Sequence, residues 1–148
     1  MAYKMKLNSP HQGMSYIWNI SAPVGVLGGL PNMPDDVELV QRLIIERYKR
    51  VPPKTPRAGG IPFIQNATGE MDVQTGVEIY WAGDHSKRLD YAETISPARG
   101  GAISYGTGFW TIAYLNSKLF THARTVWENL PDLCSPMLKH ALLTKTAP

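Results

Sequence analysis

Cysteine is almost missing from this chain: Cys134 is the one cysteine among 148 residues. No intrachain disulfide can form, so an apolar core and hydrogen bonds must hold the fold together. A chain of this length favours one domain that is large enough to bury such a core. His140 is the nearest histidine to Cys134 in the sequence, but no nucleophile motif flanks either residue. We therefore interpret Cys134 as a half-buried thiol beside a surface histidine.

Charge and long apolar runs are also scarce. Charged residues make up 18% of the chain and hydrophobic residues 43%, which is typical of a globular protein. The net positive charge is small and spread along the chain, whereas nucleic-acid-binding domains gather it on one face, so we predict no nucleic-acid partner. No stretch approaches the roughly 20 apolar residues of a membrane span. The N-terminus lacks an apolar signal-peptide core, and we expect synthesis in the cytoplasm without a signal peptide.

Metal-binding and catalytic motifs are missing as well. The chain has four histidines: His11, His85, His122 and His140. None has the partner spacing of a zinc site, so we expect no metal and no cofactor. Asp84, His85 and Asp90 form the one cluster of acids and imidazole. A polar loop is the favoured interpretation of this cluster, and a zinc site or general base is the alternative.

The most organised segment lies between Leu30 and Pro53 and predicts a helix. Pro34 suits the first turn, and Asp35 and Asp36 complement the positive helix end, with either able to cap it. An apolar stripe at helical spacing runs through Val37, Val40, Ile44 and Tyr48, and is widened by Leu39 and Leu43. Basic residues and two prolines end the helix. We expect this stripe to lie in the core.

The remaining elements are predicted more briefly. Residues 1–13 are interpreted as a polar arm, and residues 14–21 alternate in polarity like a short strand. A second helix is expected from Asp72 to Gly83, with Val73, Val77, Tyr80 and Trp81 on its core side. A third should begin near Thr107 or Gly108, and a last one at Ser135 and Pro136. Tyr91 and Tyr105 lie in an irregular stretch and are candidates for exposed contacts.

Four segments together resemble the peptidoglycan-binding-like domains. They are APVGVLGGLPNMPDDVELVQRLI, RVPP, GGIPFIQNATGEMDVQTGVEI and ISP…GTGFWTIAYLN, within residues 22–116. The residues that match the family motifs include Val24, Gly25, Asn32, Asp36, Gln41, Leu43, Gly69, Asp72, Thr75, Ile79, Pro97, Thr111, Leu115 and Asn116. Among these, Asn32, Asp36, Asp72, Thr75 and Asn116 are expected to be structural. Gln41 is expected on the exposed side of its helix, as a ligand contact together with Tyr91 and Tyr105.

The resemblance implies a mainly α fold. Residues 22–119 would form a small three-helix peptidoglycan-binding-like bundle with long loops, and three short amphipathic helices can share one core. Residues 1–21 would form an N-terminal arm and strand, and residues 120–148 a helical extension packed on the same domain.

The function implied is non-catalytic binding of peptidoglycan or another bacterial envelope glycan. We expect the chain to act with protein partners in a multi-subunit assembly, such as a phage tail or an injection particle. One alternative is a purely structural adaptor or virion protein without glycan binding. A second alternative is a small cell-wall hydrolase that uses Asp84, His85 and Asp90.

Overall fold

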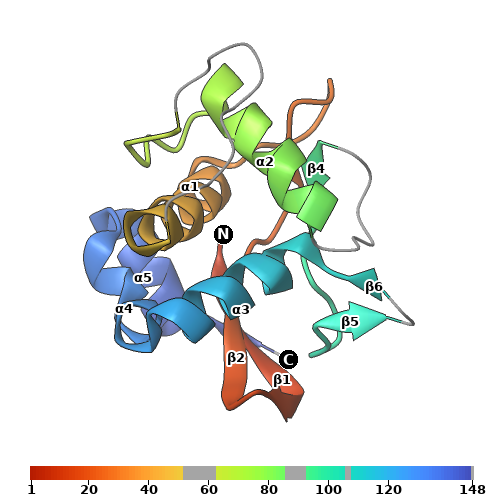
Figure 1. Cartoon of the computed structure of the whole chain (residues 1–148), viewed down its shortest axis with the longest axis vertical. Helices are drawn as coiled ribbons and strands as arrows, with labels where there is room; N and C mark the ends of the chain where they lie inside the picture. Colours follow the sequence, from red (N-terminus) through yellow and green to blue (C-terminus); the bar gives the residue numbers. More distant parts are fainter. Residues whose placement is uncertain (52–62, 86–92, 106–107, 148) are drawn as a thin grey trace.

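The computed structural model describes residues 1–51, 63–85, 93–105 and 108–147, without the side chains of residues 83–85 and 105. Along the chain the elements are β1 (Tyr3–His11), β2 (Met14–Asn19), β3 (Val24–Gly25), α1 (Pro34–Arg50), α2 (Val73–His85), β4 (Thr94–Ile95), β5 (Ser104–Tyr105), β6 (Gly108–Phe109), α3 (Thr111–His122), α4 (Arg124–Glu128), the 3-10 helix η2 (Leu130–Leu133), α5 (Pro136–Thr144) and β7 (Thr146–Ala147) (Figure 1). The helices surround α1, and a three-stranded sheet closes one side.

The fold is mixed α/β, so the prediction of a mainly α three-helix bundle is wrong. The described residues form a three-stranded sheet in the order β2-β1-β7 and the two-stranded pairs β3-β4 and β5-β6. The helical part of the prediction did place its elements correctly. The helices α1, α2, α3 and α5 occupy the expected segments, each within a few residues of the expected start.

The interpretation of residues 1–13 as a polar arm is also wrong, because β1 and β2 form an antiparallel hairpin. Met5 pairs with Ile17 in its register, and the side chain of Met5 is buried. Gln12 and Gly13 connect the strands with φ angles of +51° and +89°. Positive φ at both residues of a two-residue loop suits the right-handed twist of the flanking strands. The expected strand within residues 14–21 is confirmed as β2.

The two ends of the chain lie in the same sheet. Strand β7 runs parallel to β1, with Lys4 opposite Thr146. The backbone N–H of Lys4 also donates to the carbonyl of Lys145 at 2.9 Å. The C-terminal segment therefore completes the sheet that the N-terminal hairpin begins (Figure 1).

Helix α1 is the centre of the core. The expected stripe is confirmed, since Val37, Val40 and Ile44 are buried together with Leu39 and Leu43. Burial continues around the helix and covers its polar residues too: Asp35, Asp36, Glu38, Gln41 and Glu46. A helix that is buried on all sides must satisfy such groups by hydrogen bonds to neighbouring elements. Each of these side chains joins α1 to a neighbour or forms an ion pair.

The acids at the start of α1 do not cap it. The N-cap residue is Met33, which makes no side-chain capping bond. Asp36 instead accepts hydrogen bonds from the backbone N–H groups of Ser21 and Ala22 and from the Ser21 hydroxyl, at 2.9, 3.1 and 2.9 Å. Asp35 accepts from the N–H of Ala2 at 2.7 Å. Burial raises the pKa of the Asp36 carboxyl above its ordinary value. These acids tie the N-terminal strands to α1.

Glu38 joins α1 to the C-terminal part of the chain. Its carboxylate accepts from the backbone N–H and the hydroxyl of Ser135, at 2.8 and 2.6 Å. The Ser135 hydroxyl oxygen in turn accepts from the N–H of Leu138 at 3.4 Å, so Ser135 is the N-cap of α5, as expected.

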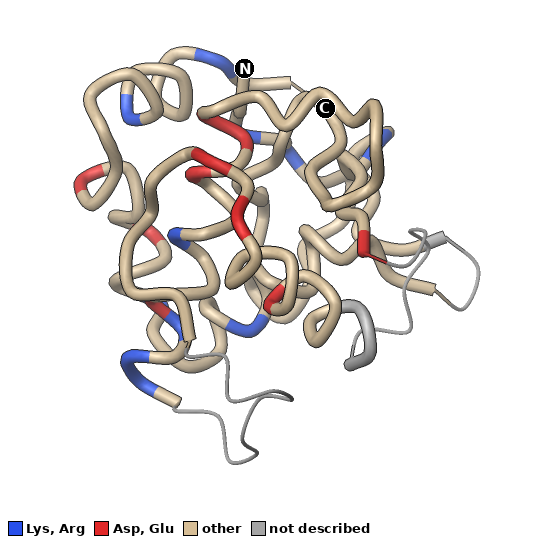
Figure 2. Tube along the Cα trace, turned by 90° about the horizontal axis from the view of Figure 1, so that it is seen from above, with Lys and Arg blue, Asp and Glu red and all other residues tan. Residues whose placement is uncertain are grey.

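Basic residues do not gather on one side of this core in the described part of the chain (Figure 2). Figure 2 shows Lys and Arg scattered along the trace rather than gathered on one side, within the described part of the chain. Several acids lie on the buried helix α1.

Candidate functional site

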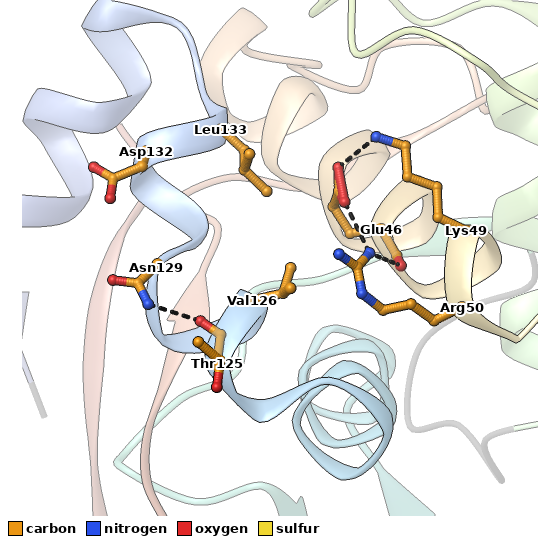
Figure 3. A pocket seen from close by; sticks show the side chains of 8 residues that line it. All are labelled: Glu46, Lys49, Arg50, Thr125, Val126, Asn129, Asp132 and Leu133. Carbon is orange, nitrogen blue, oxygen red and sulfur yellow. Dashed lines mark hydrogen bonds and ion pairs between the residues drawn. The ribbon is translucent and has the colours of Figure 1, made fainter.

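At least three cavities lined by described residues have a size suited to ligands, and two of these lie along the helices α2 and α1. The first, here called the α2 groove, has a volume of about 500 Å³ and is lined by Val26, Val73, Gly76, Val77, Tyr80, Trp81 and Glu93. The second, here called the α1–α4 pocket, has a volume of about 360 Å³ and is lined by Glu46, Lys49, Arg50, Thr125, Val126, Asn129, Asp132 and Leu133 (Figure 3).

The α2 groove is an open, mostly apolar surface with aromatic side chains. Val73 is 71% exposed and Tyr80 is 44% exposed, and Val26 beside them is also exposed. The rings of Tyr80 and Trp81 meet edge to face, with centroids 6.4 Å apart. Glu93 is the one acidic residue of the lining. Such a surface can contact an apolar face of a ligand and accept a hydrogen bond at its rim.

The groove exposes the face of α2 that the sequence assigned to the core. Val73 and Tyr80 are exposed, whereas the buried face carries Thr75, Ile79 and Ala82. Apolar residues on one face of a helix usually indicate the side that packs on the core. Helix α2 carries apolar residues on two faces, so this pattern does not identify the buried side. The buried side of α2 instead includes the polar residue Thr75, whose hydroxyl accepts a hydrogen bond from the buried Gln41 of α1.

Close packing fixes the wall of the groove beside α2. A side chain at Gly76 would place its Cβ 2.5 Å from Cγ1 of Val26, so a larger residue there would require the Val26 side chain to move. Strand β3 next to Val26 pairs with β4 next to Glu93, and the N–H of Val26 donates to the carbonyl of Glu93 at 3.3 Å.

Asn32 anchors the loop that carries Val26. Its side-chain oxygen accepts from the N–H of Gly25 at 2.8 Å and its NH₂ group donates to the carbonyl of the same residue at 2.9 Å. Asn32 has a φ of +43°, a conformation that asparagine tolerates better than most residues. These contacts give Asn32 a structural role in this loop.

Gln41 is fully buried, so the expectation that it lies on the exposed side of its helix is wrong. Its side-chain oxygen accepts from the N–H of Gly69 at 2.9 Å. Its NH₂ group donates to the carbonyl of Glu70 at 3.0 Å and to the hydroxyl of Thr75 at 2.9 Å. Gln41 therefore holds the loop before α2 against α1 and does not face a ligand. Asp72 accepts from the N–H of Thr75 at 2.7 Å and caps α2, as expected.

Asn116 is a second buried amide with partners in three elements. Its oxygen accepts from the N–H of Trp18 and from Nε1 of Trp127, at 2.8 and 2.9 Å. Its NH₂ group donates to the carbonyls of Trp18 and Ile112, at 2.8 and 2.9 Å. The side chain of Asn116 thus joins β2, α3 and α4.

Several candidates from the sequence cannot be placed in either cavity. Tyr91 and Asp90 lie outside the described residues. Tyr105 is described only through its backbone, which pairs with Gly108 in the β5-β6 ladder. Asp84 and His85 belong to the last turn of α2, and their side chains lie outside the described part.

Cys134 lies in an environment that suppresses thiol reactivity. Burial raises the pKa of its thiol to about 12, with the nearby carboxylate of Glu38 adding to the effect. The thiol donates to the carbonyl of Leu130 at 3.3 Å. His140 is exposed. A nucleophilic pair of Cys134 and His140 does not fit this arrangement, which agrees with the interpretation of a half-buried thiol.

We expect Cys134 in the folded protein to react with a disulfide reagent at neutral pH at least about 100-fold more slowly than in the unfolded chain, because the thiolate is the reactive form. A thiol-disulfide exchange assay with and without denaturant measures this ratio. Equal rates in the two states would show that the thiol is accessible and ionised, contrary to the geometry.

The α1–α4 pocket has a charged wall and an apolar wall. On α1, the buried carboxylate of Glu46 forms ion pairs with Arg42, Lys49 and Arg50 at 3.5, 3.0 and 3.1 Å. Burial of Glu46 acts to raise its pKa, but hydrogen bonds from Lys49 and Arg50 outweigh burial and lower the pKa below its ordinary value. On the opposite side, Val126 and Leu133 point toward the cavity, while Asp132 points away (Figure 3).

Glu46→Gln is expected to reduce the free energy of unfolding at pH 7 by about 1–3 kcal/mol, because it removes buried charge-assisted hydrogen bonds. Since the folded-state pKa of Glu46 is lowered, its contribution is present above the ordinary value of 4.5 and is lost as pH falls through the folded-state pKa. Urea unfolding of both proteins from pH 7 to pH 3 should show the difference shrinking below about pH 4.5. Glu128→Gln is the control, because Glu128 and its partner Arg124 are both exposed and the pair should contribute little. A difference independent of pH would contradict the charge argument.

Comparisons with known proteins give no family for this chain. A scan against protein-family models, a search of curated protein sequences and a search of solved structures each found no match. Among the described residues, no three His, Cys, Asp or Glu side chains lie together as a metal site would require. The helices of the described segments are all too short or too polar to cross a membrane.

Proposed function

We propose that this protein is a non-catalytic module that binds a bacterial cell-wall glycan through the α2 groove. The observation that carries the proposal is the gathering of exposed apolar side chains there. Of the nine large hydrophobic residues exposed in the described structure, four lie in or beside this groove: Val26, Leu27, Val73 and Tyr80. An exposed apolar patch on a small protein marks a contact surface.

The chemistry of the groove suits a sugar chain. The C–H face of a pyranose ring can pack on an aromatic side chain, and Tyr80 offers such a surface at the rim. Glu93 can accept hydrogen bonds from sugar hydroxyl groups. An open groove also suits an extended polymer better than it suits a small molecule, which binds in a more enclosed cavity.

The resemblance to peptidoglycan-binding-like domains supports the same ligand class. The described parts of the segments that carry it include α1, α2 and α3, although the sheets make the fold different from the family expectation. We extend the proposal to the expected setting, a component of a larger envelope-crossing particle.

Co-sedimentation with purified peptidoglycan tests glycan binding. The parent protein should pellet with the polymer, and Tyr80→Ala should weaken binding at least about fivefold, because aromatic contacts dominate such surfaces. Leu143→Ala is the matched control, since Leu143 is also exposed but lies on α5. A parent protein that stays in the supernatant, or equal losses in both variants, would contradict the proposal.

The second candidate function is a structural adaptor that docks a protein on the same surface. The high exposure of Val73 favours it, because a valine at the centre of a protein interface gains from burial without any polar partner. Co-expression with the proteins encoded by neighbouring genes tests this candidate. A stable complex that Val73→Asp disrupts, together with no binding to peptidoglycan, would favour the adaptor.

A further inference from the structure

The α1–α4 pocket contains the guanidinium group of Arg50, and one side of this group forms the ion pair with Glu46. Arg50 uses a single terminal nitrogen, Nη1, for both the carboxylate and the backbone carbonyl of Glu46, at 3.1 and 2.8 Å. Its Nε and Nη2 have no partner in the described ranges of the chain. In Figure 3 the guanidinium lies between Glu46 and Val126, so its remaining edge faces the cavity. A planar guanidinium edge is suited to two parallel hydrogen bonds with a carboxylate.

The charge balance of the α1 wall favours an anion despite the carboxylate of Glu46. Arg42, Lys49 and Arg50 surround this one acid, which leaves the cluster with a net positive charge. The free carbonyl groups at the end of α1 oppose an anion, but the three basic residues of the last turn, Arg47, Lys49 and Arg50, offset that effect. Lys49 is largely exposed and adds long-range attraction.

The opposite wall of the α1–α4 pocket, formed by α4 and η2, can contact an apolar group of a ligand. Val126 from α4 and Leu133 from η2 point toward the cavity (Figure 3). Leu133 is 42% exposed, so a ligand that covers it would gain hydrophobic free energy. The volume of about 360 Å³ lies at the small end of the range for ligand sites.

We propose that the α1–α4 pocket binds an aliphatic carboxylate, with the carboxylate on the free edge of Arg50 and the aliphatic body against Val126 and Leu133. Such a group can come from the C-terminal residue of a peptide or from a free carboxylic acid. This site is separate from the α2 groove and does not depend on the glycan proposal. It gives the protein a second, anionic ligand class.

Titration followed by backbone amide NMR tests the proposal, with pentanoate and N-acetyl-leucine as probes. Both acids should cause saturable shifts at Thr125, Val126 and Leu133. Pentanamide and N-acetyl-leucine amide should bind at least about tenfold more weakly, because they lack the charge that the guanidinium recognises. Tighter binding of N-acetyl-leucine would identify a peptide end as the source, and tighter binding of pentanoate a free acid.

Two variants test the charged contact with Arg50 and the apolar contact with Leu133 separately. Arg50→Gln should abolish the shifts, whereas Arg99→Gln, which removes the same charge from an exposed position outside the pocket, should leave them unchanged. Leu133→Ser, at a position that is 42% exposed, should weaken the binding of pentanoate more than that of acetate. Equal binding of acid and amide, the absence of saturable shifts, or the same loss in Arg99→Gln would overturn the proposal. Tyr80→Ala should leave these shifts unchanged, because Tyr80 lies in the α2 groove. A failure of the glycan proposal can therefore be distinguished from a failure of this one.

Discussion

Asn116→Ala is expected to lower the free energy of unfolding by about 3–6 kcal/mol, enough to unfold a marginally stable domain. The substitution leaves the N–H and carbonyl of Trp18 and the Nε1–H of Trp127 without the partner that Asn116 provides. Each such buried group costs about 1–3 kcal/mol when its partner is removed. The backbone contacts of a short strand cannot shift to replace this amide, because the side chain of Trp18 is itself fixed by a bond from its Nε1 to the carbonyl of Trp127.

Urea unfolding followed by tryptophan fluorescence measures the loss, since Trp18 and Trp127 report on the site directly. Asn129→Ala is the control, because Asn129 is exposed and donates one bond to the carbonyl of Thr125 at the end of α4. We expect the control to change stability by less than about 1 kcal/mol. A loss in Asn116→Ala no larger than in the control would mean that the hydrogen bonds of Asn116 contribute nothing net to stability.

The role of Asn116 extends to the edge of the sheet. Strand β2 is an edge strand of the order β2-β1-β7. Asn116 pairs with both backbone groups of Trp18, as a neighbouring strand would do. Exposed edge groups invite pairing with another chain, and covering the edge is one way to prevent it. This single amide therefore both stabilises the core and closes a position of the sheet edge.

Helices were the part of the fold that local sequence could predict. The spacing of Val37, Val40 and Ile44 and the capping of α2 by Asp72 depend on residues within one or two turns. The sheets depend instead on residues that are far apart in sequence, such as the pairing of Lys4 with Thr146. No local pattern reports such a contact, and the resemblance to a helical domain family does not predict these sheets either.

The first hairpin was missed for a more specific reason. The turn residues Gln12 and Gly13 lack the Asn-Gly or Asp-Gly signature that marks most two-residue hairpin loops. Strand β1 also contains Asn8, Ser9 and Pro10 near its exposed end, and these residues favour turns over strands. The alternation of buried Met5 and Leu7 with exposed Lys6 was present, but it is short.

The candidate site was harder to predict because sequence does not show which polar residues are buried. Gln41 looks like a surface residue on a helix, and only the loop that folds over it makes it a core residue. The motif residues Asn32, Asp72 and Thr75 likewise prove to hold loops and helix ends in place. The α2 groove lies on the face of α2 that the sequence predicts as its core side.

Gln41→Leu is expected to lower the free energy of unfolding by about 3–5 kcal/mol, although leucine has nearly the same size. The change leaves the N–H of Gly69, the carbonyl of Glu70 and the hydroxyl of Thr75 without the bonds they make to Gln41. The loop packs closely against the start of α1 at Gly69, where an added Cβ would lie 3.0 Å from the carbonyl oxygen of Pro34, so it has little room to shift toward another partner. Urea unfolding measures the loss, and hydrogen exchange at the Gly69 amide reports the local opening.

Gln65→Leu provides the matched control for this experiment. Gln65 is exposed in the same loop, and among the described residues its amide donates to the carbonyl of Phe63 alone, at 3.3 Å. The identical chemical change should therefore alter stability by less than about 0.5 kcal/mol and leave exchange at Gly69 unchanged. If Gln41→Leu were as mild as this control, the loop before α2 would be held by its apolar contacts alone. In that case, the buried amide of Gln41 would contribute nothing to positioning the loop before α2.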